Sequence, residues 1–328
     1  MIVARARANA NVALAKYWGK RDEALNLPFT GSISVTLDGL ETHVSLALVP
    51  RSSSDRVRMN GAPALAAEAQ RVSRFLDLVR AQAHAATRVE VDLESNFPVA
   101  AGLASSASTF AALALASNRA FGLDLSPEQL SVLARRGSGS AARSIHGGFV
   151  EWLAGEAADG LDSRAVQVAP AHHWSIGIVV AVTDEGRKKV GSREGMAIAA
   201  RESPFFRAWL ETHAADAAAI RSGIWARDLL LVGEAAEHNC LKMHAASLAA
   251  RPSLLYWTPA TVAVIHRVRE LRADGLEAYF TIDAGPQVKV LCRAEDRAQV
   301  AEQIARVPGV RRVLLSAPGP GAEVLATR

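Results

Sequence analysis

Several stretches of the chain alternate between apolar and polar residues, the pattern of a strand with one buried face. The first runs over Ile2–Ala8, and the polar residues at 9–11 are expected to end it. Two more stretches, 32–37 and 41–49, flank Asp38-Gly39, a dipeptide typical of tight hairpin turns. We therefore predict an N-terminal strand followed by an antiparallel hairpin.

Amphipathic helices are indicated where apolar residues recur every three or four positions. This spacing extends over 63–86, and we expect its Arg71, Arg74 and Arg80 mostly on a solvated face, with one available to a ligand. Strand and helix patterns then alternate to the C-terminus, which predicts an α+β protein. Strands are expected at 88–94, 149–152, 174–182, 277–282, 288–292 and 310–315, and helices at 110–116, 126–136, 294–307 and, with breaks at Ser222-Gly223 and Arg251-Pro252, over 204–273.

Composition narrows the class of protein. The 328 residues are 50% hydrophobic, enough for one large or two ordinary domains. A net charge of +4, spread along the chain, argues against nucleic acid as a partner and is compatible with a small polyanionic substrate. Cys240 and Cys292 lack the spacing of a metal or redox motif and are expected to be buried thiols. The longest apolar run, 110–116, is too short to span a membrane, so we expect a cytoplasmic protein.

Two loops of small residues have the composition of anion-binding sites. The first, Pro98–Thr109, lies between a predicted strand and a helix, where backbone N–H groups and serine hydroxyls can hold a phosphate. It matches neither the Walker A nor the dinucleotide-binding pattern, and its serines could equally cap a buried helix. The second, Arg135–Ser144, is flanked by arginines, which favours an anion site over a linker.

Three further features carry polar chemistry. The segment Lys16–Arg21 combines cations with hydrogen-bonding aromatic residues, although a solvated turn anchored by Trp18 is the alternative. The cation-rich stretch 183–195 is expected to be a loop over a site or a solvated turn. Asp283 ends a predicted strand before Gly285-Pro286, where it could act as a base or form a simple turn. The histidines near 238–244 lack metal-site spacing.

Taken together, these motifs resemble the diphosphomevalonate decarboxylase family of the GHMP kinase superfamily. The matching segments occur in the family's order along most of the chain, and Lys-Tyr-Trp-Gly-Lys distinguishes the decarboxylases from plain kinases. The segments are Asn11–Asp22, Ser32–Leu37, Asn96–Ala107, Arg136–Ser144, Met243–Ala245 and Asp283–Pro286.

The resemblance implies a two-domain α+β GHMP kinase fold. The N-terminal ATP-binding domain, of the ribosomal-protein-like type, would span 1–183, and the C-terminal GHMP domain 184–328, with the active site in the cleft between them. The implied reaction is ATP-dependent decarboxylation of 5-diphosphomevalonate to isopentenyl diphosphate, through phosphorylation of the 3-hydroxyl. ATP and Mg²⁺ are the implied cofactors, and a homodimer is the implied assembly.

The resemblance also assigns residues. Asp283 would accept or orient the hydroxyl proton, Arg143 would hold the substrate carboxylate and help keep Asp283 ionised, and Lys16 would stabilise the transferred phosphoryl group. The implied substrate contacts are Tyr17, Trp18, Gly19, Lys20, Ser138, Gly139, Ser140, Ala141, Ala142, Arg143, Ser192 and Arg193. The implied ATP contacts are Gly102, Leu103, Ala104, Ser105, Ser106 and Ser108, with Ser105 as the Mg²⁺ ligand.

Two positions depart from the family pattern. Gly191 stands where a second serine is common, and His146 stands where an aromatic residue is expected. Both leave the phosphorylation state of the substrate open, so a monophosphate decarboxylase remains an alternative. A mevalonate 3-kinase is a second alternative, against which Asp283, Lys16 and Arg143 together argue. A non-catalytic metabolite-binding relative would have lost the base or the cations, and this chain retains both.

Overall fold

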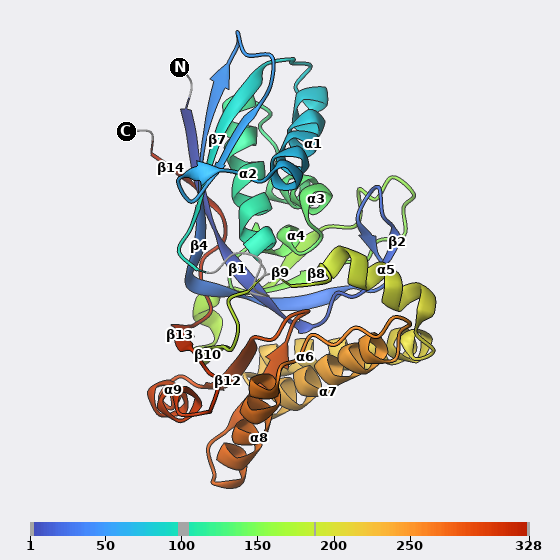
Figure 1. Cartoon of the computed structure of the whole chain (residues 1–328), viewed down its shortest axis with the longest axis vertical. Coiled ribbons are helices and arrows are strands. Elements are labelled where there is room, and N and C mark those ends of the chain that lie inside the picture. The colour runs from blue at the N-terminus through green and yellow to red at the C-terminus, as the bar shows by residue number, and fades with distance from the viewer. Residues whose placement is uncertain (1–2, 98–104, 187, 327–328) are drawn as a thin grey trace.

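The computed structural model describes residues 3–97, 105–186 and 188–326, which form two sheets with helices packed around them (Figure 1). The larger, eight-stranded sheet has the order β14-β1-β4-β7-β5-β6, with β8 and β9 joined to it through β4. Its strands are β1 (Val3–Ala15), β4 (Ser32–Val49), β5 (Arg56–Met59), β6 (Ala62–Pro63), β7 (Arg88–Ser95), β8 (Phe149–Trp152), β9 (Ala165–Ala169) and β14 (Glu323–Leu325), and a separate small ribbon pairs β2 (Lys20–Asp22) with β3 (Leu27–Pro28).

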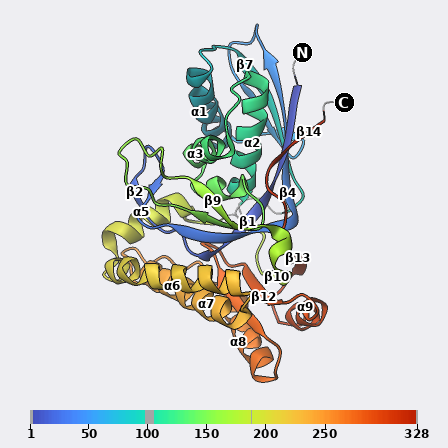
Figure 2. The same ribbon diagram turned by 180° about the vertical axis from the view of Figure 1, so that it is seen from behind.

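Helices α1, α2, α3 and α4 cover one face of this sheet (Figures 1 and 2). Their apolar faces pack on β7, on the first half of β1 and on the second half of β4. Phe75, Leu76 and Phe110 are buried in this contact. The α3 helix begins as predicted, with Ser126 in a capping box and Pro127 in the first turn. The bounds are α1 (Ala66–Gln82), α2 (Ser105–Phe121), α3 (Pro127–Gly137) and α4 (Ala141–Ser144).

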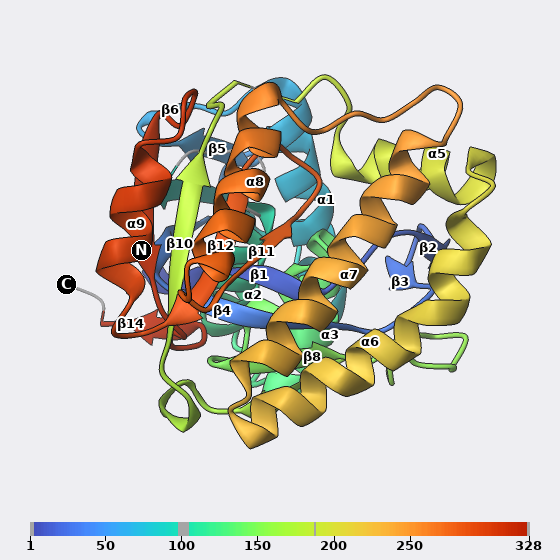
Figure 3. The ribbon, with the colours of Figure 1, turned by 90° about the horizontal axis from the view of Figure 1, so that it is seen from below.

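A second sheet of four strands, in the order β11-β12-β10-β13, lies beside a layer of long helices (Figure 3). Helix α6 contacts β1 and β4, and α7 contacts β1, so residues 10–15 of β1 and 33–40 of β4 are buried under these helices. The elements are β10 (Ile176–Val182), β11 (Ala278–Ile282), β12 (Val288–Arg293), β13 (Arg312–Ser316), α5 (Ser192–Glu202), α6 (Phe206–Ala226), α7 (Leu229–Leu248), α8 (Pro259–Ala273), α9 (Arg297–Ala305) and the 3-10 turn η1 (Ala171–His173).

The expected N-terminal hairpin is wrong. β1 continues to Ala15, and β4 runs through Asp38-Gly39 without reversing. Both halves of β4 pair with β1, with a register shift between Asn9 and Asn11. The chain stays extended because residues 317–319 bond the backbone of 36–38, while Gly39 takes the positive φ of an irregular strand.

Two other expectations need correction. The break in the long helical region falls at Arg227, whose φ is 56°, and not at Ser222-Gly223. Gly223 lies inside α6, where an added Cβ would come within 2.7 Å of Val232 on α7, so this glycine allows close helix packing. The stretch 183–195 is also not wholly loop, because α5 begins at Ser192.

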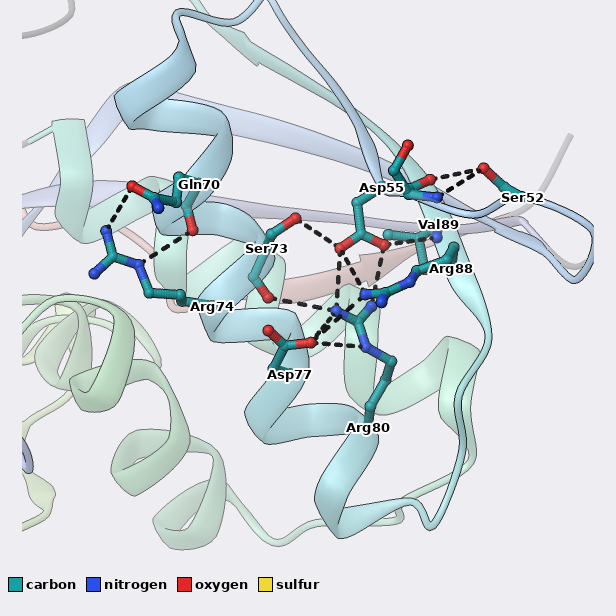
Figure 4. Close-up of polar contacts among 10 residues, drawn as sticks. Ser52, Asp55, Gln70, Ser73, Arg74, Asp77, Arg80, Arg88 and Val89 are labelled. Carbon is teal, nitrogen blue, oxygen red and sulfur yellow. Dashed lines mark hydrogen bonds and ion pairs between the residues drawn. The ribbon is translucent and has the colours of Figure 1, made fainter.

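Of the three arginines of α1, Arg74 is exposed as expected, Arg71 lines the cavity described below, and Arg80 is not on a solvated face. Arg80 is buried and donates to both oxygens of Asp55, whose side chain has no exposed surface (Figure 4). Ser73 also donates to Asp55, at 2.7 Å. This ion pair ties α1 to the β5 and β7 edge of the sheet, and Asp77 gives Arg80 a second carboxylate.

The strand β10 belongs to the second sheet, because it pairs with β12 and β13. The expected division at 183/184 would assign this strand to the N-terminal domain. The C-terminal strand β14 returns to the first sheet beside β1, so the two ends of the described chain lie together. Within the described ranges, no helix combines the length and apolar character needed to cross a membrane.

Candidate active site

A cavity of about 540 Å³ opens between the larger sheet with its covering helices and the part of the chain that forms the long helices and the second sheet. Its wall is built from the ends of β1 and α2, the loop before α4, the loop before α5 and the turn after β11. Segments far apart in sequence therefore contribute to one site. The sequence-predicted residues that line it are Lys16, Tyr17, Trp18, Lys20, Ser105, Ser106, Ser138, Gly139, Ser140, Arg143, Ser192, Arg193 and Asp283.

The two serine loops meet at the start of α2. The hydroxyl oxygens of Ser106 and Ser138 are 3.0 Å apart, and Ser105 is the first residue of the helix. A helix N-terminus offers N–H groups and a partial positive charge to an anion. Gly102, Leu103 and Ala104, predicted as ATP contacts, lie outside the described residues.

Arg143 is held on α4 by two polar partners from the sheet. It donates to Ser32 Oγ and, at 3.1 Å, to Asn11 Oδ1. Among the described residues, Arg143 Nε and the Tyr17 hydroxyl have no hydrogen-bond partner, although both are buried at the cavity. Burial lowers the pKa of Arg143 to about 10, so its guanidinium stays charged near neutral pH. Unpartnered buried polar groups of this kind favour a polar ligand.

Asp283 lies between two lysines at the floor of the cavity. Its carboxylate accepts from Lys16 Nζ at 2.9 Å and from Lys289 Nζ at 3.2 Å. Burial acts to raise the pKa of Asp283, but the two ammonium groups outweigh it and hold this pKa well below its usual range. Lys16 and Lys289 are thus the groups that contact Asp283 and ionise it, and Arg143 adds the electrostatic attraction that was expected of it.

More cations surround the opening. Burial lowers the pKa of Lys20 to about 8, with Arg193 contributing, and it lowers the pKa of Lys188 to about 8, with Lys289 contributing. Burial also lowers the pKa of Arg71 to about 10. These cations lower one another's pKa because they lie close together around the same cavity. A bound polyanion would relieve that repulsion.

Four predicted contact residues do not line the cavity. Gly19 packs on Phe206, and its positive φ serves the turn after β1. Ala141 and Ala142 are fully buried in apolar clusters, because α4 turns their side chains into the domain. Ser108 is buried and bonds Thr42 and the Ser105 carbonyl.

Sequence reasoning missed three cations of the site. Lys289 stands in an otherwise apolar strand, Val288–Cys292, and a lysine in a buried strand is a signal for an anionic partner. Lys188 lay in the loop flagged as covering a site, but it was not singled out. Arg71 is one of three arginines of which one was expected to face a ligand, but helical spacing does not say which of them does.

The residues present fit a magnesium nucleotide. In the described ranges no three histidine, cysteine, aspartate or glutamate side chains gather as a metal cage. Mg²⁺ is commonly held by substrate phosphates together with few protein oxygens. The serine hydroxyls at the start of α2 and the Asp283 carboxylate provide hard oxygen donors around the same cavity.

The fold and this cation-rich cavity define a two-domain α+β protein of the GHMP kinase class. Residues 8–165 match the diphosphomevalonate decarboxylase-like N-terminal domain, and residues 178–314 match the mevalonate 5-diphosphate decarboxylase C-terminal domain. The chain belongs to the diphosphomevalonate decarboxylase family.

Individual relatives are similar over nearly the whole chain. The diphosphomevalonate decarboxylase of Eremothecium gossypii is 38% identical, with 94% of this chain and 82% of that protein covered. The human enzyme is 37% identical, with 92% and 78% covered. The solved structure of mevalonate diphosphate decarboxylase from Staphylococcus aureus is 36% identical with a TM-score of 0.93, covering 99% of this chain and 98% of that one. A structure of MDDEF with MVAPP, AMPPCP and magnesium is 38% identical with a TM-score of 0.92 and 99% coverage of both chains.

Proposed function

We propose that the protein catalyses ATP-dependent decarboxylation of 5-diphosphomevalonate. The products are isopentenyl diphosphate, ADP, phosphate and CO2. The observation that carries the proposal is the Asp283 carboxylate held between Lys16 and Lys289 at the floor of a cavity lined with cations. The proposal is supported by the similarity to MDDEF, which has been solved with MVAPP, AMPPCP and magnesium.

In the first step the tertiary 3-hydroxyl oxygen attacks the γ-phosphorus of ATP, and ADP leaves. Asp283 accepts a hydrogen bond from that hydroxyl and receives its proton. A carboxylate with a lowered pKa is a weak base, which suffices because the hydroxyl becomes acidic as its oxygen bonds to phosphorus. Lys16 stabilises negative charge on the phosphoryl group in flight.

In the second step the 3-phosphate departs as inorganic phosphate and the carboxylate is lost as CO2, leaving the new double bond. Arg143 orients the substrate carboxylate through the donor that Ser32 and Asn11 leave unused. Tyr17, Lys20, Ser192 and Arg193 contact the diphosphate end of the substrate. Lys188 and Arg71 add positive charge to the same space.

The ATP phosphates rest at the start of α2, against Ser105 and Ser106. Mg²⁺, when bound there, offsets the charge of the phosphates, and Ser105 is the proposed protein ligand. The helix N-terminus and the cations of the opposite loops do the rest of the neutralisation. Catalysis is then mainly a matter of holding two polyanions in line.

We further propose a cytoplasmic homodimer, with the domain division moved from 183/184 to a point before β10, because β10 pairs with β12 and β13 of the second sheet. Two buried free cysteines are in keeping with a reducing compartment. Large exposed apolar side chains such as Trp225 (60%) and Leu255 (67%) are available for contact with a second copy. Light scattering coupled to gel filtration gives the assembly directly.

The deciding experiment measures ADP and CO2 release on mevalonate with no, one or two 5-phosphates. Release of both products from the diphosphate alone is the expected result. ADP without CO2 would indicate a 3-kinase, and turnover of the monophosphate alone would change the substrate. No turnover of any of the three compounds would reject the proposed function.

A further inference from the structure

A buried polar network lies behind Lys16, on the side away from the cavity. Asn239 on α7 is fully buried, and its Oδ1 accepts from the backbone N–H of Lys16 at 2.7 Å. Its Nδ2 donates to Asp216 Oδ2 at 2.9 Å and lies 3.2 Å from His213 Nδ1. Figure 3 shows α6 and α7, which carry these residues, crossing the ends of β1 and β4. The helical layer therefore reaches the backbone of a residue that contacts Asp283.

The hydrogen atoms in this network have one consistent assignment. His213 Nε2 lies 2.9 Å from the carbonyl oxygen of Gly31, which can only accept, so Nε2 carries the proton. His213 Nδ1 is then an acceptor for one Asn239 hydrogen, and Asp216 accepts the other. The Asn239 oxygen is left for Lys16. A second proton on His213 would face the Asn239 amide and break this arrangement.

The network touches two parts of the site at once. Through Asn239 it holds the backbone of Lys16, whose Nζ is anchored by Asp283 and by the Ala13 carbonyl at 2.7 Å. Through His213 it holds Gly31, the residue before Ser32, which accepts from Arg143. A catalytic group is positioned accurately only when the residues that contact it are themselves held in place.

We propose that Asn239, oriented by neutral His213 and by Asp216, is a positioning residue that sets Lys16 against Asp283. This rests on the proposed function of Lys16 and Asp283 in phosphoryl transfer. Asn239 does not line the cavity, so it acts through the backbone of Lys16. Its loss should impair the chemical step more than substrate binding.

The first test compares Asn239→Leu with the double variant Asn239→Asp/Asp216→Asn. Leucine has a similar volume and removes the acceptor for Lys16, so we expect kcat to fall about 100-fold with KM for both substrates within about threefold. The double variant keeps an acceptor for Lys16 and exchanges the donor and the acceptor between residues 239 and 216, so no two carboxylates face each other and kcat should stay within about tenfold. Arg221→Gln is the control, because it breaks a different α6 contact with the sheet, to Glu151. Equal losses in Asn239→Leu and the double variant, or near-normal kcat in Asn239→Leu, would overturn the proposal.

A pH profile separates positioning from general loosening. The charged or titratable groups around Asp283 are Lys16, Lys289, Lys188, Arg143, Cys240 and His244. If Lys16 withdraws in Asn239→Leu, Asp283 loses a cation and its pKa rises, so the acid limb of kcat should move to higher pH. An unmoved acid limb beside a reduced kcat would assign Asn239 a structural role only.

Two histidine variants provide a second arm. His213→Asn can place its oxygen near the Nδ1 position and keep the acceptor for Asn239, so kcat should stay within about twofold of the unaltered value. His213→Gln keeps the donor to Gly31 but not that acceptor, and kcat should fall about tenfold. The reverse order would contradict the tautomer and the proposal.

Amide hydrogen exchange tests the geometry without turnover. The Lys16 amide should exchange about 100-fold faster in Asn239→Leu and remain protected in Arg221→Gln. Unchanged protection would reject the Asn239 contact itself. If the unaltered protein had no decarboxylase activity but Lys16 exchanged as expected, the proposed function would fail while the positioning contact stood.

Discussion

Asp55 and Asp283 are both carboxylates paired with cations, but their surroundings differ. Asp55 has no exposed side-chain surface, and both of its oxygens are fully engaged by Arg80, Ser73 and the Val89 amide (Figure 4). Asp283 retains 22% exposure and accepts from one lysine on each oxygen. A saturated carboxylate has no capacity for a ligand, whereas Asp283 keeps free lone pairs facing a cavity.

The balance of positive and negative charge also differs between the surroundings of Asp55 and those of Asp283. Arg80 and Arg88 both pair with Asp55 and Asp77, so the cluster under α1 has one carboxylate for each cation. Around Asp283 two lysines face one carboxylate, and Lys188 adds to the excess. A buried excess of positive charge is costly unless an anion arrives. The cluster around Asp55 therefore stabilises the fold, whereas the cluster around Asp283 is prepared for a ligand.

The largest effect is expected from Asp283→Asn. Loss of the proton acceptor should lower kcat about 10³- to 10⁴-fold, because the hydroxyl loses its base, while the cations still bind ATP. ADP and CO2 release measure kcat, and circular dichroism checks the fold. A variant that keeps more than a tenth of the turnover would contradict the assigned role of Asp283.

Asp55→Asn should damage stability and leave the chemistry intact. Breaking a buried ion pair removes about 3 kcal/mol from the free energy of unfolding, since Arg80 keeps only Asp77. Chemical denaturation measures this loss, and kcat per folded molecule should stay within about twofold. A large drop in kcat with normal stability would reverse the assignment of the two clusters.

Lys289→Met tests the charge excess directly. Asp283 keeps Lys16, but its pKa rises, and we expect kcat to fall about 10- to 100-fold with an acid limb displaced to higher pH. Lys289→Arg, which preserves the charge, should show a smaller displacement of the limb. Identical pH profiles in these two variants would show that charge is not what Lys289 contributes.

Stability should depend on pH through Asp55. Its donors hold its pKa below the unfolded value, although burial opposes them, so its stabilisation is present above the unfolded pKa and is lost as the pH falls through the folded one. Below about pH 4, unfolding free energy should drop by up to about 1.4 kcal/mol per pH unit for this group. Asp55→Asn should lack that contribution, so its free energy of unfolding should fall less steeply with falling pH than that of the unaltered protein. Equal slopes for the two proteins, measured by denaturation at several pH values, would contradict the assignment to Asp55.

Asp92→Asn is the matched surface control for Asp55. Asp92 pairs with Arg58 at 3.4 Å, with both side chains more than half exposed. Solvent screening makes such a pair worth less than about 0.5 kcal/mol. A loss as large as that of Asp55→Asn, measured in the same denaturation series, would show that burial is not the source of the difference.

The sequence by itself determined most of the elements and the content of the site. Periodicity located α1, α3, α8 and the strands of the second sheet, because the spacing of apolar residues acts within a few residues, and the structure shows Ser126 and Thr258 as caps at two of these helix starts. Motifs of small and cationic residues pointed to a polyanion site, since that chemistry needs particular residue types close together.

Tertiary structure alone decided which way β4 runs and which charges meet. Residues 317–319 keep Asp38-Gly39 extended, and no local signal announces a partner almost three hundred positions away. The same holds for Lys289 beside Asp283 and for Asn239 behind Lys16, which come together only when β12 pairs with β11 and α7 packs against β1. Local sequence pattern indicates which interactions a residue can make, and burial and packing determine which of these interactions form.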